Sequence, residues 1–291
     1  MKPAQQRRTD SDAAWRGLHA AATTPYRRSG RFAWHFARGK LGRDPVFRGM
    51  LERGDLPPQA RVVDIGCGQG LRASLLQACA NSQAAGAWPA AWPAAASATA
   101  YTGIELMPRD VARAQAAIGQ LALAPQLVCA DMRQAALPPC DVVVILDVLH
   151  YVDHAAQRQL LQRVHEALRQ GAATPRSPAA APAPGRLLLR VGDAASQRGF
   201  AVSQWVDRVV TTVRGHRVPP TWGRPLADWV ALLAGLGFQV HAVPMSQGTP
   251  FANVLLVADM GPAALAAPGV ALEAGRTPPW APAPTAQGSA S

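Results

Sequence analysis

The part of the sequence that most constrains the fold is residues 61–70, which read RVVDIGCGQG. A short β-branched run predicts a buried strand, and this strand ends near the acidic Asp64. Glycines permit a tight turn and the close approach of a ligand to the backbone, and here they follow at three alternate positions, Gly66, Gly68 and Gly70. Residues 71–80 then have helical spacing. This order predicts the ligand crevice of an open α/β sheet, at the carboxyl end of its first strand.

The glycine spacing separates two classes of nucleotide-binding loop. A dinucleotide fingerprint, G-x-G-x-x-G, would require a glycine where this chain has Leu71. The pattern D-x-G-x-G-x-G instead resembles the first motif of class I S-adenosylmethionine (SAM) dependent methyltransferases. The resemblance implies that Asp64 holds the methionine amino group, and that the loop contacts the amino-acid and ribose parts of SAM through Gly66, Cys67, Gly68 and Gly70. Without that resemblance, a tight strand-to-helix turn would explain the glycines equally well.

A second motif covers residues 101–106, a strand that ends in Glu105 and is followed by a helix start at Pro108. A carboxylate at this place can accept hydrogen bonds from both ribose hydroxyls. It lies 35 residues beyond Gly70, whereas about 20 is usual. An Ala/Pro/Trp-rich surface insertion at residues 81–98 accounts for the excess. We therefore expect Glu105 and Leu106 at the cofactor; the alternative is a solvated acid at a strand end.

Two further motifs complete the resemblance, which extends over residues 46–258. In residues 126–132 a strand is followed by Asp131 and Met132, which the resemblance places near the adenine amino group and against the adenine ring. Residues 142–146 form a continuous apolar run, as expected of a central parallel strand. Asp147 and His150 lie just beyond its carboxyl end, where such folds carry functional residues.

The resemblance implies a Rossmann-like α/β fold with a mostly parallel, seven-stranded sheet and a C-terminal antiparallel hairpin. We expect one methyltransferase domain at residues 26–260, a disordered N-terminus at 1–25, and a disordered tail at 261–291. Hydrophobic spacing predicts the helical segments 31–51, 109–120, 154–170, 200–213 and 226–236. The remaining strands are expected at 185–191, 238–243 and 252–258. Residues 171–185 are rich in Pro and Ala, and we expect a linker that does not pack.

Composition fits a globular protein, since 49% of the 291 residues are hydrophobic and 16% are charged. The four cysteines form no C-x-x-C pair, so we expect reduced thiols and neither a metal site nor a disulfide. The N-terminus lacks the apolar stretch of a secretory signal, which predicts a cytoplasmic protein.

The net charge of +11 comes almost entirely from arginine. Basic residues alternate with aromatic ones in residues 27–53 and 186–224. Such segments can bind nucleic acid, an anionic small molecule or an acidic carrier protein. No compact basic run and no RNA-binding module is recognisable, so RNA is an alternative rather than the main hypothesis.

Methyl transfer requires an acceptor aligned with the methyl group and shielded from water. An acceptor hydroxyl also needs a proton sink, and His150 is the best-placed candidate; the alternative is that it only packs against the cofactor or orients its loop. Asp147 is expected to hold that loop or the methionine amino group. Amide and nucleobase N-methyltransferases of this family carry Asn/Asp-Pro-Pro-Tyr/Phe here. Leu146, Asp147, Val148 and Leu149 occupy these positions and argue against that chemistry.

Acceptor contacts are expected from segments outside the sheet, with Arg190, Trp205, His216 and Trp222 as candidates. Arg31, Trp34, His35 and Arg38 can close the other side. The whole pattern also faintly resembles methyltransferases of bacterial aryl-polyene and polyketide-like pathways, which implies O-methylation of a small aromatic or carrier-bound acyl substrate. Two alternatives are an RNA methyltransferase and a non-catalytic, methyltransferase-like interaction protein. SAM affinity in the micromolar range would argue against the last.

Overall fold

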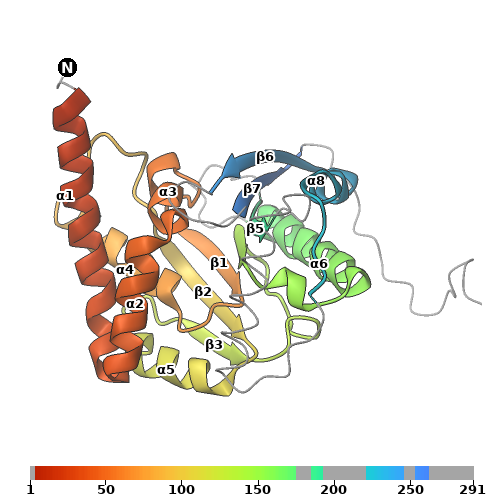
Figure 1. The fold of residues 1–291 in the computed structure, drawn as a ribbon, viewed down its shortest axis with the longest axis horizontal. Coiled ribbons are helices and arrows are strands. Elements are labelled where there is room, and N and C mark those ends of the chain that lie inside the picture. Colours follow the sequence, from red (N-terminus) through yellow and green to blue (C-terminus); the bar gives the residue numbers. More distant parts are fainter. Residues whose placement is uncertain (1–3, 175–184, 193–220, 246–252, 262–291) are drawn as a thin grey trace, which may run out of the picture.

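The computed structural model describes residues 4–174, 185–192, 221–245 and 253–261. A seven-stranded sheet in the order β3-β2-β1-β4-β5-β7-β6 forms its centre (Figure 1). All neighbouring strands are parallel except the pairs β5–β7 and β7–β6, which are antiparallel. The strands are β1 Ala60–Ile65, β2 Ala98–Glu105, β3 Gln126–Cys129, β4 Val142–Leu146, β5 Arg186–Gly192, β6 Phe238–Pro244 and β7 Asn253–Met260. The expected parallel sheet with a terminal antiparallel hairpin is confirmed.

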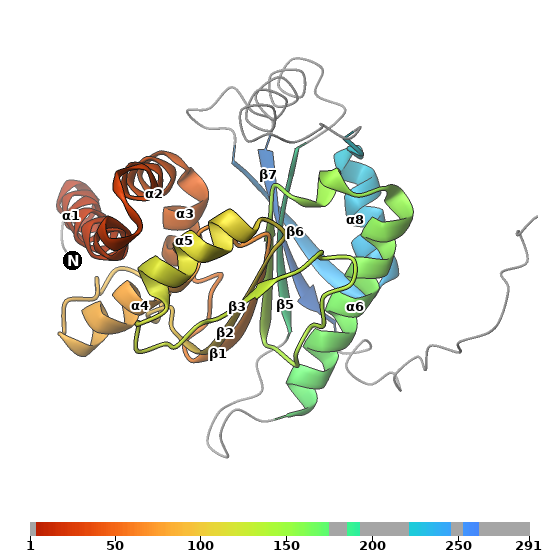
Figure 2. The same cartoon turned by 90° about the horizontal axis from the view of Figure 1, so that it is seen from below.

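Helices cover both faces of the sheet. Figure 2 shows α1 to α5 on one side and α6 with α8 on the other. The helical elements are α1 Ala4–Thr23, η1 Thr24–Ser29, α2 Arg31–Arg43, α3 Pro45–Arg53, α4 Leu71–Ala84, α5 Pro108–Ile118, η2 Leu149–Tyr151, α6 His154–Ala173 and α8 Leu226–Gly235. The helix expected at 200–213 lies outside the described residues, as does the tail beyond Gly261.

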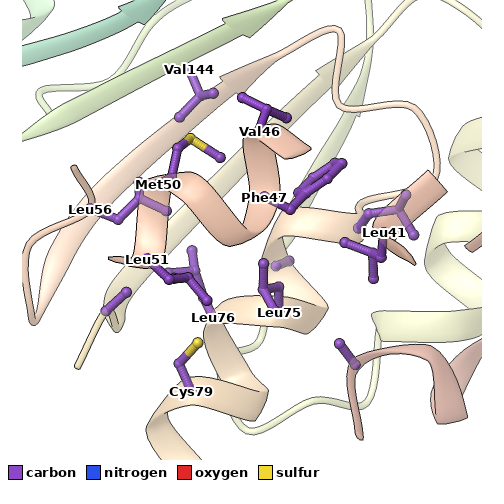
Figure 3. Packing of buried hydrophobic residues seen from close by; sticks show 14 of the residues in the cluster. Leu41, Val46, Phe47, Met50, Leu51, Leu56, Leu75, Leu76, Cys79 and Val144 are labelled. Atoms are coloured by element: carbon purple, nitrogen blue, oxygen red, sulfur yellow. The ribbon is translucent and has the colours of Figure 1, made fainter. Parts of the chain in front are cut away.

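Strand β4 explains the two-layer core. All five of its residues are buried, because helices cover both faces of a central parallel strand. Val142, Val144 and Leu146 belong to one hydrophobic cluster, and Val143 and Ile145 to the other, as the period of two in a strand requires. Figure 3 shows the first cluster, in which α3 lies over this strand.

The N-terminus differs from the expectation of disorder. Ala4–Thr23 form helix α1, whose Leu18 and Ala22 are buried. The Ser74 hydroxyl of α4 donates to the Ala22 carbonyl at 2.7 Å, so α1 is attached to the domain. The helix carries many alanines and charges and no strong apolar stripe. Its packing comes from Leu18 and Ala22, with Trp15 against the same cluster, and this is a weaker signal in sequence than a row of leucines.

The two expected insertions are also more ordered than predicted where they are described. Residues 81–84 continue α4, and the loop after it buries Trp92, whose indole Nε1 donates to the Ser11 hydroxyl of α1 at 2.9 Å. The supposed linker begins inside α6, and a Cβ at Gly171 would lie 1.8 Å from the Cys140 carbonyl oxygen. This glycine packs directly against the backbone before β4, while residues 175–184 lie outside the described part of the chain.

No helix in the described part of the chain is both long and apolar enough to span a bilayer. Cys67, Cys79 and Cys140 are buried free thiols, and Cys129 is an exposed one.

Candidate cofactor and acceptor site

The carboxyl ends of the central strands lie level with one another. Ile65 of β1 pairs with Ile104 of β2 on one side and with Ile145 of β4 on the other. The residues that follow these three isoleucines therefore meet at one edge of the sheet. They are the glycine loop, Glu105 and the turn that begins at Asp147.

The glycine loop is held against the end of β2. The amides of Gly66 and Cys67 both donate to the Ile104 carbonyl, at 2.8 and 3.1 Å. A Cβ at Gly66 would lie 2.5 Å from a Val148 methyl, so the turn after β4 closes directly on the loop. Gly68 has φ +56°, and a Cβ there would meet no atom within 4 Å. The backbone at Gly68 is thus open on the side where a side chain would project, as an approaching ligand requires.

Glu105 joins the second strand to this loop. Its Oε2 accepts from the Gly68 amide and its Oε1 from the Met107 amide, each at 2.9 Å. Burial raises the pKa of the carboxyl above its ordinary value, and these amide hydrogen bonds offset part of the increase. Each carboxylate oxygen can accept a further hydrogen bond, so Glu105 can still receive two hydroxyls.

Asp64 is not placed as expected. Its side chain is 0% exposed, and its Oδ2 accepts from Arg72 Nε at 2.6 Å. Arg72 Nη2 and the Tyr101 hydroxyl make further short contacts with the same carboxylate. The expectation that Asp64 holds a methionine amino group stays a prediction; in this structure the carboxylate is buried and its partners are Arg72 and Tyr101.

Residues expected near adenine lie beyond β2 and β3. Leu106 is 60% exposed and directly follows Glu105 at the end of β2. Asp131 accepts from the Arg133 amide at 2.8 Å and from its guanidinium at 2.6 Å. These hydrogen bonds lower the pKa of the Asp131 carboxyl. Met132 is partly buried against the second hydrophobic cluster.

The turn after β4 contains the two catalytic candidates. Asp147 adopts φ +60°, a left-handed conformation, and its Oδ1 accepts from Arg190 Nε at 2.7 Å. Arg190 is 3% exposed and also binds Asp44. Arg190 was expected at the acceptor; in this structure its guanidinium instead donates to two carboxylates, those of Asp44 and Asp147.

His150 lies in η2 and is partly buried, with its ring centroid 4.2 Å from that of Tyr151. Its carbonyl accepts from the Trp222 amide at 2.8 Å. The Trp222 ring is 40% exposed and meets His154 edge-on at 5.4 Å. The backbone of Trp222 is thus bonded to that of His150, whereas Trp205 and His216 lie outside the described residues.

Gln157, a residue that no sequence motif marks, holds this arrangement together. Its side chain is fully buried in α6. Its amide donates to the carbonyls of Leu149, Val152 and Trp222, at 3.2, 3.0 and 2.8 Å. Its oxygen accepts from Arg224 at 2.7 Å. One side chain thus fastens residues 222–224 to the turn that carries His150.

The entry segment contributes differently from the expectation. Arg31, His35 and Arg38 are exposed, and the guanidinium groups of Arg27 and Arg38 lie 5.2 and 4.9 Å from the centroid of the Trp34 ring. The residues of this segment that reach the crevice are instead Lys40, whose Nζ lies 3.9 Å from Asp147, and Asp44. In the sequence, Asp44 is marked only by the Pro45 that follows it, because an Asp-Pro pair indicates the start of a helix.

Part of the sequence and the fold as a whole resemble those of known proteins. Residues 63–173 match the family model described as a methyltransferase domain. The chain shares the fold of the SAM-dependent methyltransferase SibL in its apo form, at a TM-score of 0.52 and 17% identity over 79% of this chain and 57% of that one. It is also similar to magnesium protoporphyrin IX methyltransferase from Synechocystis PCC 6803 with bound S-adenosylhomocysteine (SAH). That similarity has a TM-score of 0.47 and 20% identity over 81% of this chain and 93% of that one.

None of the curated proteins matches the sequence. Within the described residues, no group of three or more His, Cys, Asp or Glu side chains is arranged to hold a metal ion. Residues 63–173 thus match a methyltransferase domain, and they lie within a fold that the chain shares with a SAM-dependent methyltransferase.

Proposed function

We propose that the chain transfers the methyl group of SAM to a hydroxyl of a small aromatic or carrier-bound acyl acceptor. The observation that carries the proposal is the meeting, at one edge of the sheet, of an open glycine backbone, a partly buried carboxylate and an exposed leucine. Gly68, Glu105 and Leu106 supply these three features. Directly beside them, the turn after β4 carries His150.

The residues present fit SAM at this place. Glu105 has acceptor capacity for both ribose hydroxyls, and Leu106 offers an apolar surface for the adenine ring. The open position at Gly68 admits the cofactor close to the backbone. We assign Asp131 and Met132 to the adenine side as well, and Gly66, Cys67 and Gly70 to the loop itself. Bound SAM supplies a methyl group on a sulfonium, which reacts by in-line displacement.

The chain's own residues then align the acceptor, exclude water and remove one proton. We assign the proton to His150, the histidine on the turn directly after β4. Trp222 gives the acceptor an apolar wall, and Gln157 holds Trp222 and η2 in one arrangement. Asp147 orients the turn rather than reacting.

Calorimetry with SAH tests the cofactor assignment. Binding in the micromolar range, about −8 kcal/mol, is expected. Absence of binding would favour the non-catalytic interaction protein.

An acceptor screen tests the chemistry. Labelled SAM is supplied with phenols, aryl-loaded acyl carriers or tRNA. Label in a phenolic or acyl hydroxyl, lost in His150→Ala while SAH affinity stays unchanged, supports the proposal. Label in tRNA alone would replace it with the RNA methyltransferase.

A further inference from the structure

Helix α3 is held at both ends by arginines of one strand, β5. At the N-terminal end, Arg190 Nη1 and Nη2 donate to the two oxygens of Asp44 at 2.6 and 2.8 Å. At the C-terminal end, Arg186 Nη1 donates to the carbonyls of Gly54 and Asp55 at 3.3 and 3.0 Å. Because β5 runs toward the crevice, only the Arg190 end lies near the proposed cofactor site.

Asp44 is part of the helix as well as of the ion pair. Its Oδ1 also accepts from the Val46 amide at 3.1 Å, which caps the first turn of α3. Lys40 of α2 contributes a second cation 2.8 Å from Asp44. The N-terminal helices are thereby joined through charge to the end of β5.

Arg190 also reaches the turn after β4. Its Nε donates to Asp147 Oδ1 at 2.7 Å, and its Nη2 contacts Asp147 Oδ2. Asp147 has φ +60°, a conformation that a residue with a side chain rarely adopts without support. The guanidinium supplies that support, since it is buried and its donors converge on two carboxylates.

The next residue of the turn carries the effect to the glycine loop. Val148 occupies the space where a Cβ at Gly66 would stand. Any change in the backbone at Asp147 therefore shifts the side chain that closes on the loop. A contiguous path of contacts leads from Asp44 through Arg190, Asp147 and Val148 to Gly66.

We infer that Arg190 is a positioning residue for cofactor binding: it clamps the turn 147–151 to the N-cap of α3, so that the N-terminal helices set the shape of the glycine loop. The inference rests on the proposed cofactor site. Arg190 itself touches neither cofactor nor acceptor, and it acts through Asp147 and Val148.

The matched control is Arg186, which lies on the same strand and makes a comparable set of bonds at the opposite end of α3. We expect Arg190→Met to weaken SAH binding at least ten-fold by calorimetry. Arg186→Met should change it less than two-fold, although both variants lower the unfolding midpoint. Unchanged affinity in Arg190→Met, or an equal loss in both variants, would overturn the inference.

A second comparison separates positioning from general loss of structure. Glycine adopts φ +60° without support, so an Asp147→Gly background should no longer depend on Arg190. The double variant Asp147→Gly/Arg190→Met should bind SAH less than three-fold more weakly than Asp147→Gly alone. A full ten-fold loss in that background would also overturn the inference. Failure of the wild-type protein to bind SAH would instead contradict the proposed function.

Discussion

Arg72, in the first turn of α4, donates from Nε to Asp64 at 2.6 Å, across the glycine loop that separates the two residues. The Tyr101 hydroxyl of β2 reaches the same carboxylate. All three side chains are buried. The acidic residue that opens the motif therefore joins β1, β2 and α4 beneath the loop, and the loop's shape depends on this ion pair.

We therefore expect Asp64→Ala to lower the free energy of unfolding. It leaves the Arg72 guanidinium buried without its partner, and removal of one member of a buried pair costs about 3–5 kcal/mol. Urea unfolding measures this loss. Tyr101→Phe is the milder control, because it removes one hydrogen bond to a charged group, about 1.5–3 kcal/mol. If the Asp64→Ala protein is stable but no longer binds SAH, Asp64 contacts the cofactor directly.

Substitutions of the glycines should separate packing from ligand binding. Gly68→Ala meets no protein atom, so its cost to stability is limited to left-handed backbone strain, about 1–2 kcal/mol. The new methyl group projects where we place the cofactor, and SAH affinity should fall at least ten-fold.

Gly66→Ala provides the comparison, because its Cβ would lie 2.5 Å from Val148. We expect the larger loss of stability in this variant, measured by thermal unfolding. Equal SAH affinity in Gly68→Ala and the wild-type protein would place the cofactor elsewhere.

The sheet was predictable because its strands carry strong local signals. The continuous apolar run of β4 and the glycines after β1 predicted both strand positions and the crevice between them. The expected strands at 185–191 and 238–243 differ by one residue from β5 and β6. These signals lie within short segments of sequence. A continuous apolar run of this length is typical of a parallel strand that is buried on both faces.

The partners of the charged residues were not predictable. The resemblance places Asp64 at the cofactor, and Arg190 is expected at the acceptor because it lies at the fifth strand. The pairing of Arg190 with Asp44 spans 146 residues of sequence, and no periodicity reports such a contact. The role of Gln157 was not predictable either. Its side chain donates to backbone carbonyls, and any residue type at those positions supplies a carbonyl.

SAH binding should weaken as the pH falls through the pKa of Glu105. Burial raises that pKa above the usual 4.5, so the folded apoprotein binds the proton more tightly than the unfolded chain. For this group, apoprotein stability therefore falls as pH rises between the two pKa values. Cofactor binding has the opposite sign, because ribose hydroxyls donate to the ionised form and binding releases the proton. Calorimetry in buffers of different ionisation enthalpy measures that release.

Glu105→Gln is the control for this pH dependence. It should bind SAH more weakly at neutral pH by about 1–3 kcal/mol, because charge-assisted hydrogen bonds are lost. It should show no proton release in the same acidic range. Proton release that persists in Glu105→Gln would assign the titration to another group.

Leu106 and Val128 offer a matched pair for the adenine side. Both are exposed aliphatic side chains, at 60% and 40%, but Leu106 follows Glu105 at the crevice while Val128 lies within the edge strand β3. Burial of a leucine side chain contributes about 1.5–3 kcal/mol, so Leu106→Ser should weaken SAH binding roughly ten-fold or more. Its unfolding midpoint should hardly change, since the side chain is already exposed in the apoprotein. Val128→Ser should leave SAH affinity unchanged and lose some stability, because serine is the poorer strand former. A loss of SAH affinity in Val128→Ser, with none in Leu106→Ser, would move the adenine ring from the end of β2 to the edge of the sheet.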